Sequence, residues 1–318
     1  MTDVPLHELE MRKVYALTLV DLADSDPDIV VVEADLGKAS GTIPTYSEAH
    51  PERFIDAGVA EADMIGIGAG LAVDGMIPFC ASFTCFATRR VYDQVTISVA
   101  YADANVKIVG TAPGITTGAN GGTHMCFQDL AIMRAMPNMV VFSPCDVYEL
   151  SSCVRWMAQY GHPAYMQMIR PVQPQIFDDD YVFDPETAVQ MSEGDAATLV
   201  STGWTTQFAK QAAEELAEEG VAADHLHYAS VKPFDEESLL ESARKTGWVV
   251  TVENQSVIGG LGGAVCEVLC ERLPTPVKRL GVHDQFGEVA TEQYLLNKHN
   301  MNVEHIKQAC KQGEGGAQ

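Results

Sequence analysis

The stretch Met76–Gly110 reads MIPFCASFTCFATRRVYDQVTISVAYADANVKIVG, and it decides the fold class. Its first residues, Met76–Cys80, and its last, Val106–Gly110, are short apolar runs of the kind that form buried strands. Between them, Arg89–Tyr101 is predicted to be a helix. Strands separated by helices form βαβ units, in which the two strands are parallel. The stretch therefore predicts a parallel sheet covered by helices.

The same alternation continues on both sides of this stretch and is interrupted once. Further strands are predicted at Asp28–Val32, Met139–Phe142 and Ala164–Ile169, and then at Ala197–Ser201, Ala223–Tyr228, Trp248–Val252 and Val277–Leu280. Between these two groups, residues 170–193 contain three prolines and an Asp triplet, a composition typical of a linker. We therefore predict an α/β protein of two domains, residues 1–175 and 194–318, with a linker at 176–193. Each domain is expected to hold a mainly parallel sheet flanked by helices.

Composition excludes several classes of function. The 20 Lys and Arg residues against 44 Asp and Glu give a formal net charge of −24. Such a charge argues against nucleic acids and anionic membranes as partners, because phosphate binding needs clustered cations. No apolar run is long enough to span a bilayer, and the N-terminal residues lack the pattern of a secretory signal, so we expect a cytoplasmic protein. The eight cysteines form no CxxC pair, and no metal site is predicted.

Glu61 is the first side chain suited to chemistry. It lies in the sequence DAGVAEADMIG (56–66), at the predicted start of a glycine-rich apolar helix. A carboxylate there gains from the helix dipole, so a plain capping role is one interpretation. The apolar surroundings favour the other interpretation, because a carboxylate in such company needs a dedicated hydrogen-bond partner.

Two further segments are candidates for binding. Phe83 and Phe86 follow a predicted strand, at the edge where open α/β sheets bind ligands, with core packing as an equal alternative. His124 ends the glycine-rich segment Gly118–His124, where a histidine is more often functional than buried. A second glycine-rich segment, Gly259–Gly263, precedes a predicted helix, and its interpretations are helix packing or, less favoured, anion binding.

These segments, in this order and spacing, resemble the pyrimidine-binding domain of transketolases. The resemblance is carried by Ala34–Leu36, Gly58–Glu61, Phe83–Phe86, Gly118–His124, Asp129–Arg134, Pro137–Asn138 and Ser143–Asp146. Two later segments, Thr251–Gly263 and Gly281–Gly287, are similar to the C-terminal domain of the same family. The resemblance extends over essentially the whole chain, but it reaches only the C-terminal half of a transketolase. The Gly-Asp-Gly…Asn segment that holds Mg²⁺ and the diphosphate in the N-terminal half is not found in this sequence.

The resemblance implies a role for each matching residue. Glu61 is implied to hydrogen-bond N1′ of the aminopyrimidine of thiamine diphosphate and to act as an acid–base group through the cofactor. The residues implied in cofactor binding are Asp35, Glu61, Phe83, Phe86 and Arg89, with Phe86 stacked on the pyrimidine. The residues implied in substrate binding are Arg12, Asn120, His124 and Arg170. Of these, His124 is also implied in catalysis, and the two arginines would hold a phosphate.

Three positions depart from the family pattern. Ala112 stands where the family has a histidine on the phosphate side, and Asn120 stands where it has an aspartate that reads a substrate hydroxyl. Arg89 stands where it has a tyrosine near the pyrimidine. Asn120 can still hydrogen-bond but carries no charge. These changes leave the cofactor chemistry intact and leave the donor and acceptor sugars open.

The implied protein is the C-terminal subunit of a split, two-chain transketolase. It would transfer a two-carbon ketol unit between a ketose and an aldose, both sugar phosphates, as in the pentose phosphate pathway. An N-terminal partner subunit would carry the ligands of Mg²⁺ and the diphosphate, in an assembly with two copies of each chain. The alternatives are the decarboxylase beta subunit of a 2-oxo-acid dehydrogenase complex, a fragment of 1-deoxyxylulose-phosphate synthase, and a catalytically inactive subunit. The segment Asp129–Arg134 and the spacing of Phe83 and Phe86 are closer to transketolase than to the first two.

Overall fold

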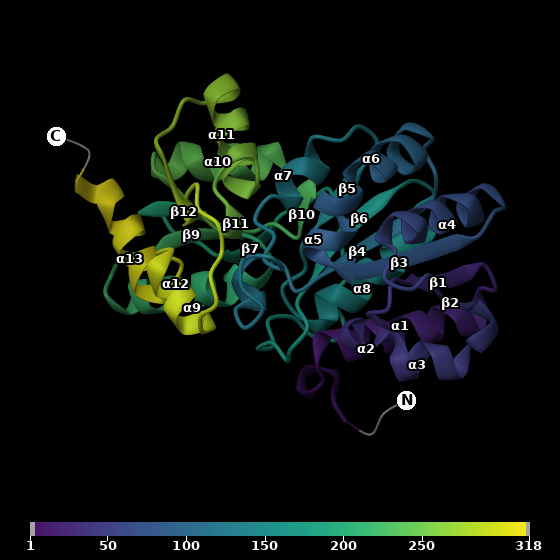
Figure 1. The fold of residues 1–318 in the computed structure, drawn as a ribbon. Helices are drawn as coiled ribbons and strands as arrows, with labels where there is room; N and C mark the ends of the chain where they lie inside the picture. The colour runs from purple at the N-terminus through teal and green to yellow at the C-terminus, as the bar shows by residue number, and fades with distance from the viewer. Residues whose placement is uncertain (1–3, 316–318) are drawn as a thin grey trace.

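The computed structural model describes residues 4–315, and the predicted domain ends at residues 1–3 and 316–318 lie outside that range. The chain forms two α/β domains, each a sheet flanked by helices, that lie side by side (Figure 1). The first sheet has the strand order β10-β5-β6-β4-β3-β1-β2, and the second has the order β12-β11-β8-β9-β7. The predicted fold class is confirmed.

Six strands of the first sheet come from the first domain and are parallel to one another. They are β1 (Ile29–Glu33), β2 (Phe54–Asp56), β3 (Ile77–Phe83), β4 (Lys107–Thr111), β5 (Val140–Phe142) and β6 (Ala164–Met168). The central strands are buried along their full length, as expected for a sheet covered on both faces. The βαβ unit predicted from residues 76–110 is present as β3 and β4, which pair in parallel.

Helices cover both faces of this sheet. One face packs against α1 (Met11–Ser25), α3 (Thr42–Ala49) and α8 (Val147–Gln159). The other packs against α4 (Glu61–Val73), the helical segment around α6 (Tyr92–Gln94) and α7 (Asp129–Arg134). The predicted helix at residues 89–101 is irregular, because α6 lies between a 3₁₀ turn and a π-helical turn. Two short helices, α2 (Gly37–Ser40) and α5 (Thr84–Ala87), follow β1 and β3.

The second sheet is smaller and is built in the same way. Its strands are β7 (Val189–Ser192), β8 (Ala197–Ser201), β9 (Ala223–His227), β11 (Val249–Ser256) and β12 (Val277–Val282), and only β7 is antiparallel to its neighbour. The helices α9 (Thr206–Glu218) and α13 (Val303–Lys311) cover one face, while α10 (Glu236–Thr246) and α11 (Leu261–Arg272) cover the other. The helix α12 (Glu292–Lys298) lies against residues 114–117 of the first domain.

The two domains are more closely connected than the sequence predicts. The strand β10 (Ser230–Lys232) comes from the second half of the sequence, yet it pairs antiparallel with β5 at the edge of the first sheet (Figure 1). The strand β7 lies inside the segment 176–193 that is predicted as a linker. One core cluster also contains buried side chains from both sheets. The two domains are therefore joined by backbone pairing and by a common core.

Within the described residues, no helix is both long and apolar enough to cross a membrane.

Candidate active site

The first sheet has a switch point between β1 and β3. The chain leaves β1 toward β2 on one side, whereas β3 lies on the other side of β1. At such a point the loops beyond the carboxyl ends of the two strands diverge and leave a crevice. Asp35 follows β1 there with a left-handed backbone (φ 56°), and Phe83 is the last residue of β3. Asp35 and Phe83 therefore lie at the switch point, where this type of sheet forms its crevice.

Glu61 begins the helix α4 beside this crevice. Its side chain is only 5% exposed, although it carries a carboxylate. The residue preceding the helix, Ala60, provides no side-chain cap, and the carboxylate of Glu61 is bound by another side chain instead: Nη1 of Arg90 donates to Oε1 at 2.7 Å. The contact favours the interpretation of Glu61 as a carboxylate with a dedicated partner over that of a simple capping residue.

Arg90 makes a second contact, with the ring of Phe86. Its guanidinium carbon lies 3.9 Å from the centre of that ring, a stacked cation–π distance. The guanidinium thus lies between the carboxylate of Glu61 and the face of Phe86. Arg90 was not among the residues that the sequence singled out. The non-helical Thr88 separates α5, which contains Phe86, from the turn that contains Arg90, so helical spacing gave no signal for this stacking.

Two more rings complete an aromatic cluster with Phe86. The ring centres of Phe83 and Phe86 are 6.1 Å apart, and His124 lies 5.7 Å from the first and 5.4 Å from the second, each contact edge-on. Nδ1 of His124 is 2.9 Å from the hydroxyl oxygen of Thr123, which holds the imidazole in place. The glycine-rich segment therefore brings its histidine to the two phenylalanines.

Arg170 and Arg12 lie on the Phe83 side of the cluster. The guanidinium of Arg170 lies 5.1 Å from the ring centre of Phe83. The backbone amide of Arg12 donates to the carbonyl of Arg170 at 3.4 Å, so the two residues are neighbours, and burial and the charge of Arg12 lower the pKa of Arg170. Arg12 is held by Glu10, whose two carboxylate oxygens accept from Nε and Nη2 at 2.8 and 3.0 Å. Two neighbouring arginines thus lie beside each other, and such a pair suits an anion with several oxygens.

The remaining predicted residues lie around this cluster without joining it. In the described part of the chain, no hydrogen bond, ion pair or ring contact links Asp35, Arg89 or Asn120 to Glu61 or Phe86. The backbone amide of Asp35 donates to Oδ1 of Asp56 at 2.9 Å, while Asn120 is exposed. Their proposed roles stay predictions. Ala112, one of the departures from the family pattern, is buried in a small apolar cluster that includes Phe83.

The second sheet has its own switch point, between β8 and β11, and it is filled by the protein itself. Oδ1 of Asn254 accepts from the amide of Ile115 at 3.0 Å, and its Nδ2 donates to the carbonyl of Pro113 at 2.9 Å. Close by, the carboxylate of Glu253 accepts from the amides of Leu261 and Gly262 at the start of α11. The glycine-rich segment 259–263 thus does bind an acidic group, and this group is the buried side chain of Glu253 in the same chain.

One buried group of side chains has the composition of a metal site. Cys145, Glu149 and His227 offer ligand atoms within 4.8 Å of one another. The carboxylate of Glu149 is already used by protein groups: the amide of Cys145 donates to it at 2.7 Å, the hydroxyl of Tyr181 donates at 2.9 Å, and Nε2 of His227 lies 2.9 Å away. Because Glu149 is on α8 and His227 on β9, the group forms a polar link between the two domains.

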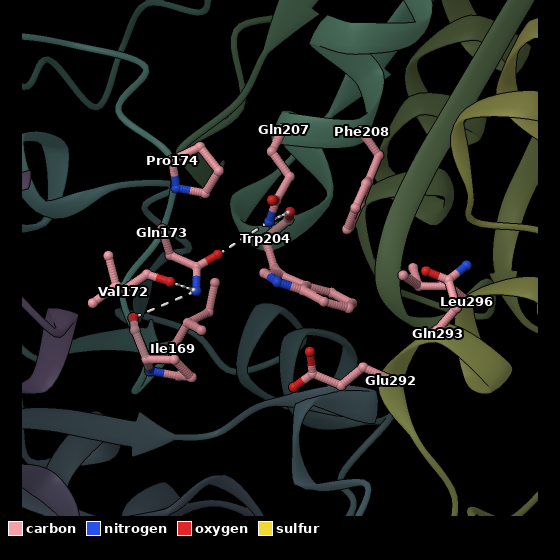
Figure 2. Close-up of a pocket in the computed structure, with 11 residues that line it drawn as sticks. Ile169, Val172, Gln173, Pro174, Trp204, Gln207, Phe208, Glu292, Gln293 and Leu296 are labelled. Carbon is pink, nitrogen blue, oxygen red and sulfur yellow. Dashed lines mark hydrogen bonds between the residues drawn. The ribbon is translucent and has the colours of Figure 1, made fainter. Parts of the chain in front are cut away.

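A pocket of about 360 Å³ lies between the segment after β6 and the helices α9 and α12. Figure 2 shows Trp204 and Phe208 on one side of it and Glu292 below, with Nε2 of Gln207 donating to Oε1 of Gln173 at 3.0 Å. None of the residues predicted for the site lines this pocket. It therefore belongs to the junction of the two domains and is separate from the crevice at Glu61.

Comparison with known proteins agrees with the fold and with the resemblance. Residues 7–173 match the family "Transketolase, pyrimidine binding domain", and residues 186–306 match "Transketolase, C-terminal domain". The chain is 46% identical to the 6-deoxy-6-sulfo-D-fructose transketolase subunit SqwH of a Clostridium species, over 97% of this chain and 95% of that protein. It is 37% identical to one subunit of the apulose-4-phosphate transketolase of Phocaeicola vulgatus, over 86% of this chain and 88% of that protein.

A solved structure has the same fold along nearly the whole chain. It is described as a split gene transketolase, inactive beta4 tetramer, and it superposes with a TM-score of 0.89 at 41% identity. The match covers 96% of this chain and 98% of that one. The two family matches together span more than half of the sequence, and the resemblance predicted from its motifs is confirmed. The chain belongs to the transketolase family, of which it carries the pyrimidine-binding and C-terminal domains.

Proposed function

We propose that this chain is the C-terminal subunit of a cytoplasmic, two-chain transketolase that uses thiamine diphosphate to transfer a two-carbon ketol unit from a ketose to an aldose. The observation that carries the proposal is the arrangement of Glu61 and Phe86 around the guanidinium of Arg90. A flat group with N–H donors fits between a buried carboxylate and an aromatic face. The aminopyrimidine of thiamine diphosphate is a flat group of that kind, so the residues present fit the cofactor.

The chain's own residues have distinct tasks in this reaction. Glu61 would exchange a proton with a ring nitrogen of the bound aminopyrimidine, and its burial keeps competing water away from the carboxylate. Phe86 provides the stacking surface that orients the ring, and Phe83 and His124 fix Phe86 from its edges. Thiamine diphosphate, when bound, supplies the electron sink that ketol transfer requires. His124 is also placed to bind a substrate hydroxyl.

The substrate is proposed to be a sugar with a terminal anionic group. Arg170 lies beside the aromatic cluster and Arg12 is its neighbour, and a guanidinium pairs with the oxygens of a phosphate or a sulfonate. The names of the two relatives support this choice, because one contains a sulfonated sugar and the other a sugar phosphate. Given the identity of 46%, 6-deoxy-6-sulfo-D-fructose is the first donor to test.

The enzyme is proposed to need a second chain. The name of the 46% identical relative includes the word subunit, and the solved neighbour is described as an inactive tetramer of beta chains. We propose that an N-terminal partner supplies the ligands of Mg²⁺ and the diphosphate, and that two copies of each chain assemble.

The proposal is tested with Glu61→Gln in the enzyme assembled from both chains. Gln keeps the size of the side chain but cannot exchange the proton, so ketol transfer is expected to fall by about 10²–10⁴-fold. The matched control is Glu236→Gln, which removes a surface carboxylate paired with Arg272 far from the crevice. Thermal unfolding of each variant checks that the fold is intact.

The outcome separates the alternatives. Unchanged ketol transfer by a folded Glu61→Gln enzyme would refute the catalytic assignment. Acyl transfer from a 2-oxo acid, measured in place of ketol transfer between sugars, would favour the decarboxylase beta subunit. No activity of either kind in the assembled wild type would favour a structural or regulatory subunit.

A further inference from the structure

We infer that Arg90 competes with the pyrimidine of the cofactor for the space between Glu61 and Phe86, and so limits the affinity of the assembled enzyme for thiamine diphosphate. The inference rests on the proposed function, because it concerns the same seat. It goes beyond that function by assigning an affinity-setting role to a residue that neither the sequence motifs nor the comparisons point to.

The first step is the position of the guanidinium. It donates to Oε1 of Glu61 at 2.7 Å, and it lies 3.9 Å from the ring centre of Phe86. In the part of the chain that the structure describes, Glu61 and Phe86 are the partners of this guanidinium. A group that hydrogen-bonds this carboxylate oxygen and stacks on the same ring face has to lie in the same layer. Arg90 fills that layer.

The second step is that both contacts are of the kind the pyrimidine itself makes. A planar guanidinium stacks on aromatic rings and donates N–H groups to carboxylates, as an aminopyrimidine does. The two groups therefore exclude each other at one location. Binding of the pyrimidine requires Arg90 to give up both contacts before the cofactor gains its own.

The third step is that Arg90 can withdraw. Its side chain is 48% exposed, whereas that of Glu61 is 5% exposed. The long, flexible arginine can therefore move into solvent, while the buried glutamate stays where it is. Displacement costs the protein one half-exposed ion pair and one cation–π contact. These are modest interactions, and together they correspond to about a three- to thirtyfold change in a dissociation constant.

The experiment measures the dissociation constant of thiamine diphosphate by calorimetric titration of the enzyme assembled from both chains with Mg²⁺. Arg90→Met removes the charge and the planar group while keeping an unbranched side chain, and it is expected to bind the cofactor about three- to thirtyfold more tightly than the wild type. Arg90→Lys keeps the charge without the plane and is expected to lie between the two.

The matched control is Arg155→Met. Arg155 pairs with Asp21 at 2.7 Å, its side chain is 45% exposed, and it lies on α8, away from the crevice. The control therefore removes an arginine of similar exposure without touching Glu61 or Phe86, and its dissociation constant is expected to equal that of the wild type. A simple loss of net positive charge would shift both variants alike.

Each outcome decides for or against the competition. If Arg90→Met binds thiamine diphosphate as tightly as the wild type, or more weakly, the competition is refuted and Arg90 holds Glu61 in place for the cofactor. If Arg90→Met fails to fold, as thermal unfolding would show, Arg90→Lys decides on the same criterion. If the wild-type enzyme binds no thiamine diphosphate, the proposed function and this inference both fail. If the wild type binds it and the Arg90 variants do not bind it more tightly, the inference alone fails.

Discussion

Each sheet has a switch point at its carboxyl edge, between β1 and β3 in the first and between β8 and β11 in the second. The first is surrounded by charged and aromatic side chains that include Glu61, Arg90 and His124. The second is covered by the loop 113–117 of the first domain, which Asn254 binds through two hydrogen bonds. Two edges of the same architecture thus serve opposite purposes, one holding a candidate active site and the other joining the domains.

The difference qualifies the rule that open α/β sheets bind ligands at switch points. The rule identifies where a crevice forms, but other segments of the same chain determine whether that crevice is open to a ligand. In the second sheet, the hydroxyl of Thr205 donates to the carbonyl of Val252, and the amide of Ser256 donates to the carbonyl of Phe127 in the first domain. These polar groups are therefore paired inside the protein, across the junction with the first domain.

The largest expected effect is from Gly114→Ala in the covering loop. Gly114 has a φ of 58°, and an added Cβ atom would lie 1.9 Å from the backbone oxygen of Asn254. The loop would have to leave its place, which breaks both hydrogen bonds of Asn254 as well. Backbone strain and overpacking together are expected to lower the free energy of unfolding by about 4 kcal/mol.

The control for Gly114→Ala is Gly75→Ala. Gly75 also has a positive φ, 95°, but nothing lies within 4 Å of the position of its added Cβ. It carries the backbone strain without the collision, so urea unfolding is expected to show a loss of about 1 kcal/mol. Equal losses in the two variants would mean that the loop is not locked onto the second sheet.

The next largest effect is expected from Asn254→Ala. The amide of Ile115 and the carbonyl of Pro113 then lose their partner in a buried place, since Asn254 is 3% exposed and Ile115 is fully buried. Leaving buried backbone groups unpaired is expected to cost about 2–3 kcal/mol in urea unfolding. A loss below about 0.5 kcal/mol, the range of surface substitutions, would mean that the stability of the fold does not depend on the contacts at the second switch point.

The sequence predicts the central strands of both sheets but not the contacts between the two domains. The strands at residues 77–83 and 107–111 are evident because long buried strands have continuous apolar runs. The strands β7 and β10 were not predicted, since each has only three or four residues and pairs antiparallel at a sheet edge. Such short edge strands are defined by the partner they meet, which lies far away in the sequence.

The candidate site shows the same limit. Glu61, Phe83, Phe86 and His124 were identified because their motifs are local and resemble a known family. Arg90 was missed because its importance depends on a contact with a residue 29 positions earlier. Asn254 was missed for the same reason, since its partners lie 139 and 141 positions away. Local patterns reveal which residues can do chemistry, and the folded chain decides which of them meet.

Two buried titratable groups, one in each sheet, predict opposite responses to acid. Burial raises the pKa of Glu33, in β1, from 4.5 to about 8. The folded state therefore holds a proton that the unfolded chain releases, and acidification from pH 8 to pH 6 stabilises the fold. Burial lowers the pKa of His225, in β9, from 6.5 to about 3. Below about pH 6.5 the unfolded chain binds a proton at this histidine that the folded state does not bind. Acidification therefore destabilises the folded state.

The two responses are measured as unfolding free energies of single variants against the wild type. Between pH 8 and pH 6 the wild type is expected to gain about 2 kcal/mol more stability than Glu33→Gln, because the variant lacks the titrating group. Between pH 7 and pH 5 it is expected to lose about 2 kcal/mol more than His225→Gln. Parallel pH profiles of wild type and variant would show that the group in question does not titrate as its burial implies.

The smallest expected effect on stability is at the open switch point, from Arg12→Met. Arg12 is 30% exposed at its side chain and pairs with Glu10, itself 45% exposed, so the ion pair is well screened by water. Its loss is expected to change the free energy of unfolding by less than about 0.5 kcal/mol. The same substitution removes one of the two cations proposed to hold the terminal anion, so the KM for an anionic sugar is expected to rise while the fold is unchanged. A loss of about 2 kcal/mol or more would show that the first edge also depends on its charged groups for folding, and the contrast between the two switch points would then disappear.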